Sequence, residues 1–255
     1  MSIVVNREGP RVTLTIDRWA RRNSFDRKTL EDLISSLRAA QEDPEVRVIV
    51  LTAVESLFSA GADMNEPAGD SEGSNDRWRE VFQLIAGGGT PVIARVNGGA
   101  YGGSLGIIAS ADIAIGTAEA QFCFSEVRLG SVATGALVCC GQKMSLAVLL
   151  DLALTGDIFD GRQAAEAGLL TRAVPAAELD AAVERSVASI LQGAPSAIAM
   201  TKGLIRGLAR DAMSAARPWR PRSPSRWPAL RSSPRAAKPF SSAGARYFWP
   251  AESAI

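Results

Sequence analysis

Hydrophobic and polar positions in the first part of the chain follow strand and helix patterns in turn. Residues 3–6 and 11–17 are predicted to form two strands joined at Glu8-Gly9-Pro10. Asp26 is placed to cap a helix that runs to about Gln41. Its apolar face repeats at helical spacing and consists of Leu30, Leu33, Ile34 and Leu37. Residues 46–52 (VRVIVLT) form a nearly continuous apolar run, as expected for a strand covered on both faces.

The same alternation continues toward the C-terminus. Residues 65–75 are polar and rich in Gly, Pro and Ser, which predicts a mobile loop. Further elements follow from the same patterns: strands over 91–96, 112–116 and 169–174, and helices over 103–110, from Ser145 to Gly156, from Asp160 to Gly168, and from about Ala177 and Ser196. Alternating strands and helices predict an α/β fold with parallel pairing.

Histidine is absent from the 255-residue sequence. This absence excludes Ser–His–Asp and Cys–His hydrolases, zinc proteases of the HExxH type and histidine-liganded metals. Acid–base chemistry is therefore left to Glu, Asp, Lys, Tyr or Cys.

Charge is unevenly distributed along the chain. The totals of 28 basic and 27 acidic side chains give no surplus that would indicate nucleic acid binding. Residues 1–214 carry 20 basic and 26 acidic groups, whereas residues 215–255 carry eight basic groups and one acidic group. That last segment is rich in Pro, Arg and Ser without a helical period, which predicts a disordered basic extension or a frameshifted C-terminus.

Other features indicate a cytoplasmic protein. The first residues lack the pattern of a signal peptide, and no apolar run approaches the roughly 20 residues of a membrane span. The three cysteines, Cys123, Cys139 and Cys140, are an odd number and are expected to be reduced thiols.

A glycine cluster at 96–106 is the first candidate site. Residues 102–106 match the G-x-S-x-G pattern of α/β-hydrolases, but that chemistry needs a histidine which this chain lacks. The spacing fits neither a dinucleotide-binding fingerprint nor a P-loop. A helix that starts at about Gly103 would present unpaired N–H groups to a ligand, although tight strand-to-helix packing explains the glycines equally well.

A second turn of small residues favours a ligand site over mere strand-to-helix packing. Residues 58–64 (FSAGADM) follow the VRVIVLT strand, and ligands of parallel α/β folds gather at the carboxyl ends of strands. Two such turns from neighbouring strands are able to supply two converging N–H donors, an oxyanion hole.

Several segments, in order, resemble the enoyl-CoA hydratase/isomerase (crotonase) superfamily. They are FSAGAD at 58–63, VNGGAYGGS at 96–104, SADIAI at 110–115, FSEVRLG at 124–130 and LTGDIFDGRQAAEAGLLTRAV at 154–174. The resemblance, from about residue 3 to 210, implies a crotonase (ClpP/crotonase-like) spiral of ββα units over 1–195 and a helical C-terminal region that starts at 196–214. It also implies a homotrimer or hexamer, unless the atypical tail over 215–255 prevents assembly.

The resemblance also implies roles for particular residues. The oxyanion donors would be the N–H groups of Ala62 and Gly103, and Glu126 would be the proton carrier. The expected substrate and coenzyme A contacts are Arg21, Arg22, Ala60, Asp63, Met64, Tyr101 and Gly102, where Asp63 is expected to orient its own turn and Tyr101 to pack. No metal is implied, and coenzyme A enters only as part of an acyl-CoA substrate, with neither nucleic acid nor membrane as a partner.

Glu126 stands in FCFSEVRLG, whose alternating apolar residues predict a partly enclosed strand edge that would raise its pKa. Hydratases with two glutamates place the other one where this chain has Gly106. The pair GGSLG and SEVRLG resembles one-glutamate, methylglutaconyl-CoA hydratase-like members. We therefore expect hydration of a 2-enoyl-CoA, with Ser131 or Thr134 as a second water contact. A 3,2-enoyl-CoA isomerase and a catalytically weak acyl-CoA-binding relative remain open.

Overall fold

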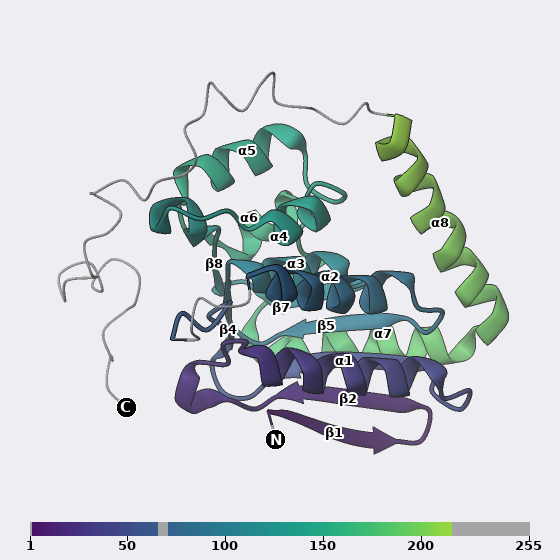
Figure 1. The fold of residues 1–255 in the computed structure, drawn as a ribbon. Helices are drawn as coiled ribbons and strands as arrows, with labels where there is room; N and C mark the ends of the chain where they lie inside the picture. Colours follow the sequence, from purple (N-terminus) through teal and green to yellow (C-terminus); the bar gives the residue numbers. More distant parts are fainter. Residues whose placement is uncertain (1, 66–70, 216–255) are drawn as a thin grey trace.

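A mixed six-stranded sheet, in the order β1-β2-β3-β5-β7-β10, forms one layer of the molecule (Figure 1). The structure is a computed structural model that describes residues 2–65 and 71–215. The strands are β1 (Ile3–Glu8), β2 (Arg11–Ile16), β3 (Val48–Ala53), β5 (Val92–Val96), β7 (Ile113–Thr117) and β10 (Arg172–Val174). β1 and β2 form an antiparallel hairpin, and the other neighbours pair in parallel. The predicted α/β fold with parallel pairing is confirmed.

A smaller four-stranded sheet carries the turns that were predicted to form the site. Its strands, in spatial order, are β4 (Leu57–Ser59), β6 (Gly99–Tyr101), β8 (Gln121–Cys123) and β9 (Phe159–Asp160). The first three pair in parallel, so their carboxyl ends lie at one edge of the sheet.

The helices α1, α5 and α6 begin at residues whose side chains cap their first N–H groups. Asp26 accepts a hydrogen bond from the Thr29 N–H at 2.8 Å, and Ser145 and Asp160 cap later helices in the same way. These three predicted starts are confirmed. The helices are α1 (Arg27–Glu42), α2 (Ser71–Gly87), α3 (Gly103–Ser110), α4 (Thr134–Cys140), α5 (Leu146–Thr155), α6 (Gly161–Glu166), α7 (Leu179–Gln192) and α8 (Pro195–Ala215).

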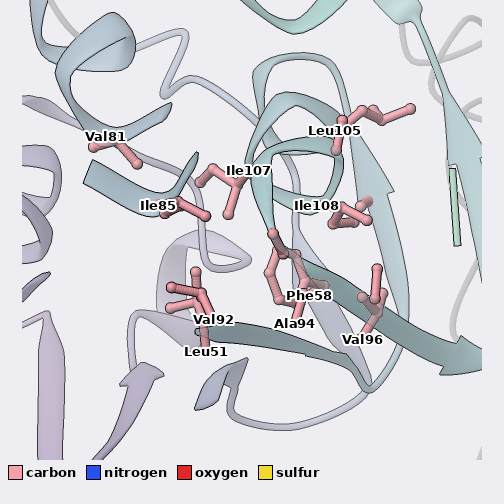
Figure 2. Close-up of a cluster of buried hydrophobic side chains, with 14 of the residues drawn as sticks. Leu51, Phe58, Val81, Ile85, Val92, Ala94, Val96, Leu105, Ile107 and Ile108 are labelled. Atoms are coloured by element: carbon pink, nitrogen blue, oxygen red, sulfur yellow. The ribbon is translucent and has the colours of Figure 1, made fainter. Parts of the chain in front are cut away.

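Both faces of the large sheet are covered. On one face, apolar side chains of α2 and α3 pack on β3 and β5, as Leu51, Val81 and Ile107 illustrate (Figure 2). On the other face, Val48 and Val50 pack against α7. Successive side chains of a strand point to opposite faces of the sheet. Because both faces are covered here, all six residues of β3 are buried. The predicted two-sided burial of this strand is confirmed.

Two helices and one turn differ from the sequence-based predictions. Residues 71–75, predicted as part of a mobile loop, begin α2, and residues 66–70 lie outside the described residues. The apolar positions of α2 repeat at helical spacing and are Trp78, Val81, Phe82 and Ile85. α4 was also not predicted. Glu126 lies on a 3-10 helix, η2 (Ser125–Leu129), and not on a strand edge, so that prediction was wrong.

The C-terminal part of the described chain is the long helix α8, which runs along one side of the molecule (Figure 1). It covers residues 196–214, where the sequence predicts a helical region. The predicted atypical tail falls almost entirely on residues 216–255, which lie outside the described residues. No helix in the described ranges is both long and apolar enough to span a bilayer.

Candidate active site

The two turns of small residues meet at the carboxyl edge of the small sheet. β4 and β6 pair in parallel, with Leu57 opposite Gly99 and Ser59 paired with Ala100. A Cβ atom built on Gly61 would lie 2.7 Å from the Tyr101 carbonyl oxygen and 3.8 Å from the Gly103 nitrogen. Because Gly61 also has a positive φ of 88°, only glycine allows this close approach without strain.

Hydrogen bonding around Phe25 orients the Ala62 amide. The Phe25 N–H donates to the Gly61 carbonyl at 2.8 Å, and the Asp63 N–H donates to the Phe25 carbonyl at 2.9 Å. Backbone amides in an extended segment alternate in direction, so the Ala62 N–H points away from Phe25. Ala62 lines the cavity that adjoins this turn, and no hydrogen bond from its N–H to another part of the described chain is found.

Glu126 follows the third parallel strand, β8, and its carboxyl group packs against Gly102. The Gly102 N–H donates to the Cys123 carbonyl at 3.0 Å, which holds the start of η2 beside the α3 turn. A Cβ atom on Gly102 would lie 3.0 Å from Cδ of Glu126 and would clash with its Oε1. The predicted proton carrier and the glycine turn are therefore in direct contact.

Burial raises the pKa of the Glu126 carboxyl group, and the nearby N–H groups of Glu126 itself and of Gly103 oppose this effect. Its Oε2 atom is buried without a hydrogen-bond partner among the described residues. The Gly103 amide and the Glu126 carboxyl group thus face the same small volume. A group with a raised pKa in this position can take up and release a proton nearer neutrality.

A cavity of about 940 Å³ adjoins these groups. Its lining includes six of the residues predicted for the site: Ala60, Ala62, Met64, Gly102, Gly103 and Glu126. The two predicted water contacts, Ser131 and Thr134, also line it. The volume suits an acyl group together with part of a larger carrier.

Four predicted contact residues do not line this cavity. Asp63 instead accepts a hydrogen bond from Arg18 at 2.8 Å and one from the Asn65 N–H at 3.0 Å, as its predicted role of orienting the turn requires. Tyr101 is buried in a small cluster with Leu57 and Cys123. Arg21 and Arg22 are exposed at the end of the 3-10 helix η1 (Trp19–Arg21).

Two aromatic residues of α2 contribute to the site, and sequence reasoning missed them. The Trp78 ring covers Gly103: a Cβ atom on this glycine would lie 3.1 Å from Cη2 of the indole. Phe82 lies between α3 and α4, where Cβ atoms on Gly106 and Gly135 would come within 2.6 and 2.7 Å of its ring. The helical spacing of these aromatic residues could have been recognised in the sequence. Their contacts with the glycines could not, because these depend on how the helices pack.

At Gly106, where the resemblance places the second glutamate of two-glutamate hydratases, the Phe82 ring fills the space that a side chain would need. Beside Phe82, the backbone of α4 also closes the space, because a Cβ atom on Gly106 would lie 2.8 Å from Cα of Ala136. Glu126 is the one carboxylate among the described residues that line the cavity. In the same described part, no group of three His, Cys, Asp or Glu side chains is arranged to hold a metal ion.

Fold and site together define an α/β protein with a small-molecule cavity at strand carboxyl ends, where backbone amides face one half-buried carboxyl group among the described residues. The model of the enoyl-CoA hydratase/isomerase family matches residues 11–221, and the chain belongs to this family. It is 30% identical over 214 residues to carnitinyl-CoA dehydratase of Salmonella enteritidis, with 80% of each chain covered.

Solved structures agree with this assignment. An enoyl-CoA hydratase from Shewanella pealeana superimposes with a TM-score of 0.76 at 27% identity, over 85% of this chain and 86% of that one. An enoyl-CoA hydratase from Mycobacterium smegmatis gives a TM-score of 0.77 at 26% identity, over 85% and 90% of the two chains. The expected crotonase fold and superfamily are confirmed, and the family supports a reaction on coenzyme A thioesters.

Proposed function

We propose that this protein hydrates a 2-enoyl-CoA thioester, with Glu126 as the proton carrier. The observation that supports this most directly is the contact between the Glu126 carboxyl group and the Gly102-Gly103 turn, beside a cavity large enough for an acyl group. The name of the Salmonella relatives, a dehydratase of a CoA thioester, agrees with this chemistry, because dehydration is the reverse of hydration.

In the proposed reaction the thioester oxygen accepts hydrogen bonds from the N–H groups of Ala62 and Gly103. Glu126 removes a proton from water, and the water oxygen bonds to C3 while the electron pair of the C2–C3 double bond moves toward the thioester oxygen. The enolate that forms is stabilised by the two amides, each typically contributing about 2.7–4 kcal/mol. Protonated Glu126 then donates its proton to C2, which regenerates the carboxylate.

Water needs a second polar contact in this scheme. Ser131 and Thr134 both line the cavity, and the Ser131 N–H donates to the Glu126 carbonyl at 3.0 Å. This hydrogen bond keeps Ser131 near the proposed base. Branched or glutaconyl-type thioesters remain the proposed substrates from sequence, with coenzyme A as the carrier and no separate cofactor.

A second candidate function is 3,2-enoyl-CoA isomerisation, favoured by the Phe82 ring at the place of a second carboxylate. One carboxyl group suffices to move a proton between C2 and C4. A third possibility from sequence, an acyl-CoA-binding relative without turnover, needs the cavity alone.

Product analysis by mass separates these functions. The protein is incubated with crotonyl-CoA, 3-methylglutaconyl-CoA and a 3-enoyl-CoA. Hydration adds one water to a 2-enoyl thioester, isomerisation moves the double bond at constant mass, and a binding relative changes none of them. Unchanged 2-enoyl thioesters would reject the hydratase assignment.

A further inference from the structure

The end of the cavity away from Glu126 carries polar groups that the proposed reaction does not use. Four residues that line this end are Ser110 at the last turn of α3, Cys139 at the end of α4, Gln142 in the turn that follows α4, and Arg206 on α8. α3 runs from Gly103 to Ser110, so the two ends of the cavity are separated by about 10 Å along the helix at a rise of about 1.5 Å per residue.

Positive charge exceeds negative charge around this far end. Asp112 accepts ion pairs from Lys202 at 2.8 Å and from Arg206 at 3.1 Å. Lys143 is nearby and donates to the Ala111 carbonyl at 2.6 Å. Three cations thus surround one carboxylate within the described chain, and the side chains of Lys202 and Arg206 are only 7% and 19% exposed.

Part of this charge has a structural role at the C-terminal end of α3. Arg206 donates through Nη2 to the Ser110 carbonyl at 2.6 Å and to the Ala111 carbonyl at 3.3 Å, which stabilises the negative end of the helix. A single carboxylate and a few carbonyl groups do not balance three half-buried cations, and burial accordingly lowers the pKa of Lys202 and lowers that of Lys143 to about 8. An uncompensated buried charge is costly, so an additional anion at this end would be favourable.

Hydrogen-bond donors are available to such an anion. All the hydrogen bonds found for Arg206 within the described chain use Nη2, which leaves the N–H groups of Nε and Nη1 for a ligand. The Ser110 hydroxyl is buried next to the Cys139 thiol, which is a weak hydrogen-bond partner, and it has no nitrogen or oxygen partner among the same residues. Burial raises the pKa of the neighbouring Cys139 thiol, so this group adds no negative charge at neutral pH.

We propose that the cavity accepts an acyl group with a carboxylate at its far end, held by Arg206 and Ser110, so that the substrate is the mono-CoA thioester of a dicarboxylic acid. The inference rests on the proposed function in one respect, that the thioester lies at Ala62 and Gly103. An extended chain advances about 1.2 Å per bond, so about 10 Å corresponds to an acyl chain of roughly eight carbons. This chain is longer than the glutaconyl group expected from sequence, so the inference replaces that expected acyl group with a longer dicarboxylic one.

Calorimetric binding of two saturated thioesters tests the proposal without requiring turnover. The probes are the mono-CoA thioester of octanedioic acid and octanoyl-CoA, which differ at the far end of the acyl chain. We expect the dicarboxylic thioester to bind at least about tenfold more tightly, because charge-assisted hydrogen bonds to a buried guanidinium are strong. The mono-CoA thioester of pentanedioic acid should gain nothing from its carboxylate, because its chain is too short.

Variants test whether the preference for the dicarboxylic thioester arises at the end of the cavity away from Glu126. Arg206→Gln should abolish it, and the matched control Arg162→Gln should retain it, because Arg162 is an exposed partner of Glu119 outside the cavity. Gln142→Glu changes an exposed cavity residue and should weaken binding of the dicarboxylic thioester by repulsion much more than it weakens binding of octanoyl-CoA. If Arg206→Gln fails to fold, Gln142→Glu still tests whether the carboxylate of the ligand binds at this end of the cavity.

Equal affinity of the wild-type protein for the two eight-carbon thioesters, or failure to bind either, would overturn the inference. A preference that persists in folded Arg206→Gln or is unaffected in Gln142→Glu would do the same. Turnover is measured separately with the corresponding 2-enoyl thioesters. A protein that prefers the dicarboxylic ligand but neither hydrates nor isomerises any thioester would reject the proposed function and leave the inference standing.

Discussion

The carboxyl group of Glu126 lies so close to Gly102 that a Cβ atom on this glycine would be 3.0 Å from its Cδ and would clash with its Oε1. Gly102 also has a φ of 56°, a conformation that other residues adopt at a cost. The location of the proposed proton carrier therefore depends on the absence of a side chain at Gly102, the residue between β6 and α3.

Gly102→Ala should reduce turnover of the enoyl thioester by about 100-fold, because displacement of a catalytic group by about 1 Å has effects of that size. Gly9→Ala is the control for the effect of backbone strain without a steric clash. Gly9 has a similar φ of 57°, and its Cβ would meet nothing within 4 Å. Steady-state kinetics of both variants make the comparison. Equal activities of the two alanine variants would contradict the proposed importance of this contact.

Glu126→Gln should lower turnover by about 10²- to 10⁴-fold, the usual contribution of a general acid–base group. Binding of a saturated acyl-CoA should change little, since the cavity retains its shape. The control is Glu119→Gln, which alters an exposed carboxyl group outside the cavity. A Glu126→Gln protein with wild-type turnover would remove Glu126 from the mechanism.

The same substitution should change how stability depends on pH. Burial raises the pKa of Glu126 in the folded protein, so the unfolded chain releases this proton at a lower pH than the folded one does. As pH rises from the ordinary pKa to the raised one, Glu126 lowers the free energy of unfolding, and the loss persists above that window. Glu126→Gln should therefore be more stable than wild type near neutral pH and lose this advantage in acid.

Thermal unfolding of wild type and Glu126→Gln at a series of pH values measures this effect. The difference in melting temperature should grow as pH rises through the window and then level off. A difference that is independent of pH would show that Glu126 does not ionise differently in the two states.

Gly106→Ala should destabilise the protein by about 1–3 kcal/mol, because the new methyl group would meet the Phe82 ring and the α4 backbone. In an open helical position the same change is stabilising by roughly 0.5–1 kcal/mol. Gly203→Ala in α8 is the matched control, since a Cβ there would meet nothing within 4 Å. Urea unfolding of both variants gives the comparison, and stabilisation by Gly106→Ala would contradict the packing described for Phe82.

Exposed apolar side chains on α5 indicate how the proposed homotrimer or hexamer could be tested. Leu146 and Leu154 are 72% and 69% exposed in the single chain. Light scattering should give a multiple of 26.9 kDa for wild type, and Leu154→Glu should reduce that multiple. Asp151→Asn, an exposed change on the same helix, should leave it unchanged. A wild-type mass of one chain would reject the assembly.

Much of the fold follows from signals that lie close together in the sequence. Asp26, Ser145 and Asp160 cap helices as predicted, because a cap acts on N–H groups within three residues. α2 was missed although its apolar residues repeat at helical spacing, because its first residues are polar and resemble a loop. The 3-10 helix at Glu126 was missed because alternating apolar residues also suit a strand.

By itself, the sequence determined the alternation of strands and helices, the two small-residue turns and the single candidate carboxylate at 126. These features depend on short-range spacing and on residue type. Only the tertiary structure decided that Phe82 fills the space between Gly106 and Gly135, and that Arg206 lies beside Ser110, 96 residues away in the chain. Such contacts depend on how separate elements pack. They join residues far apart in the chain, so no short-range pattern in the sequence indicates them.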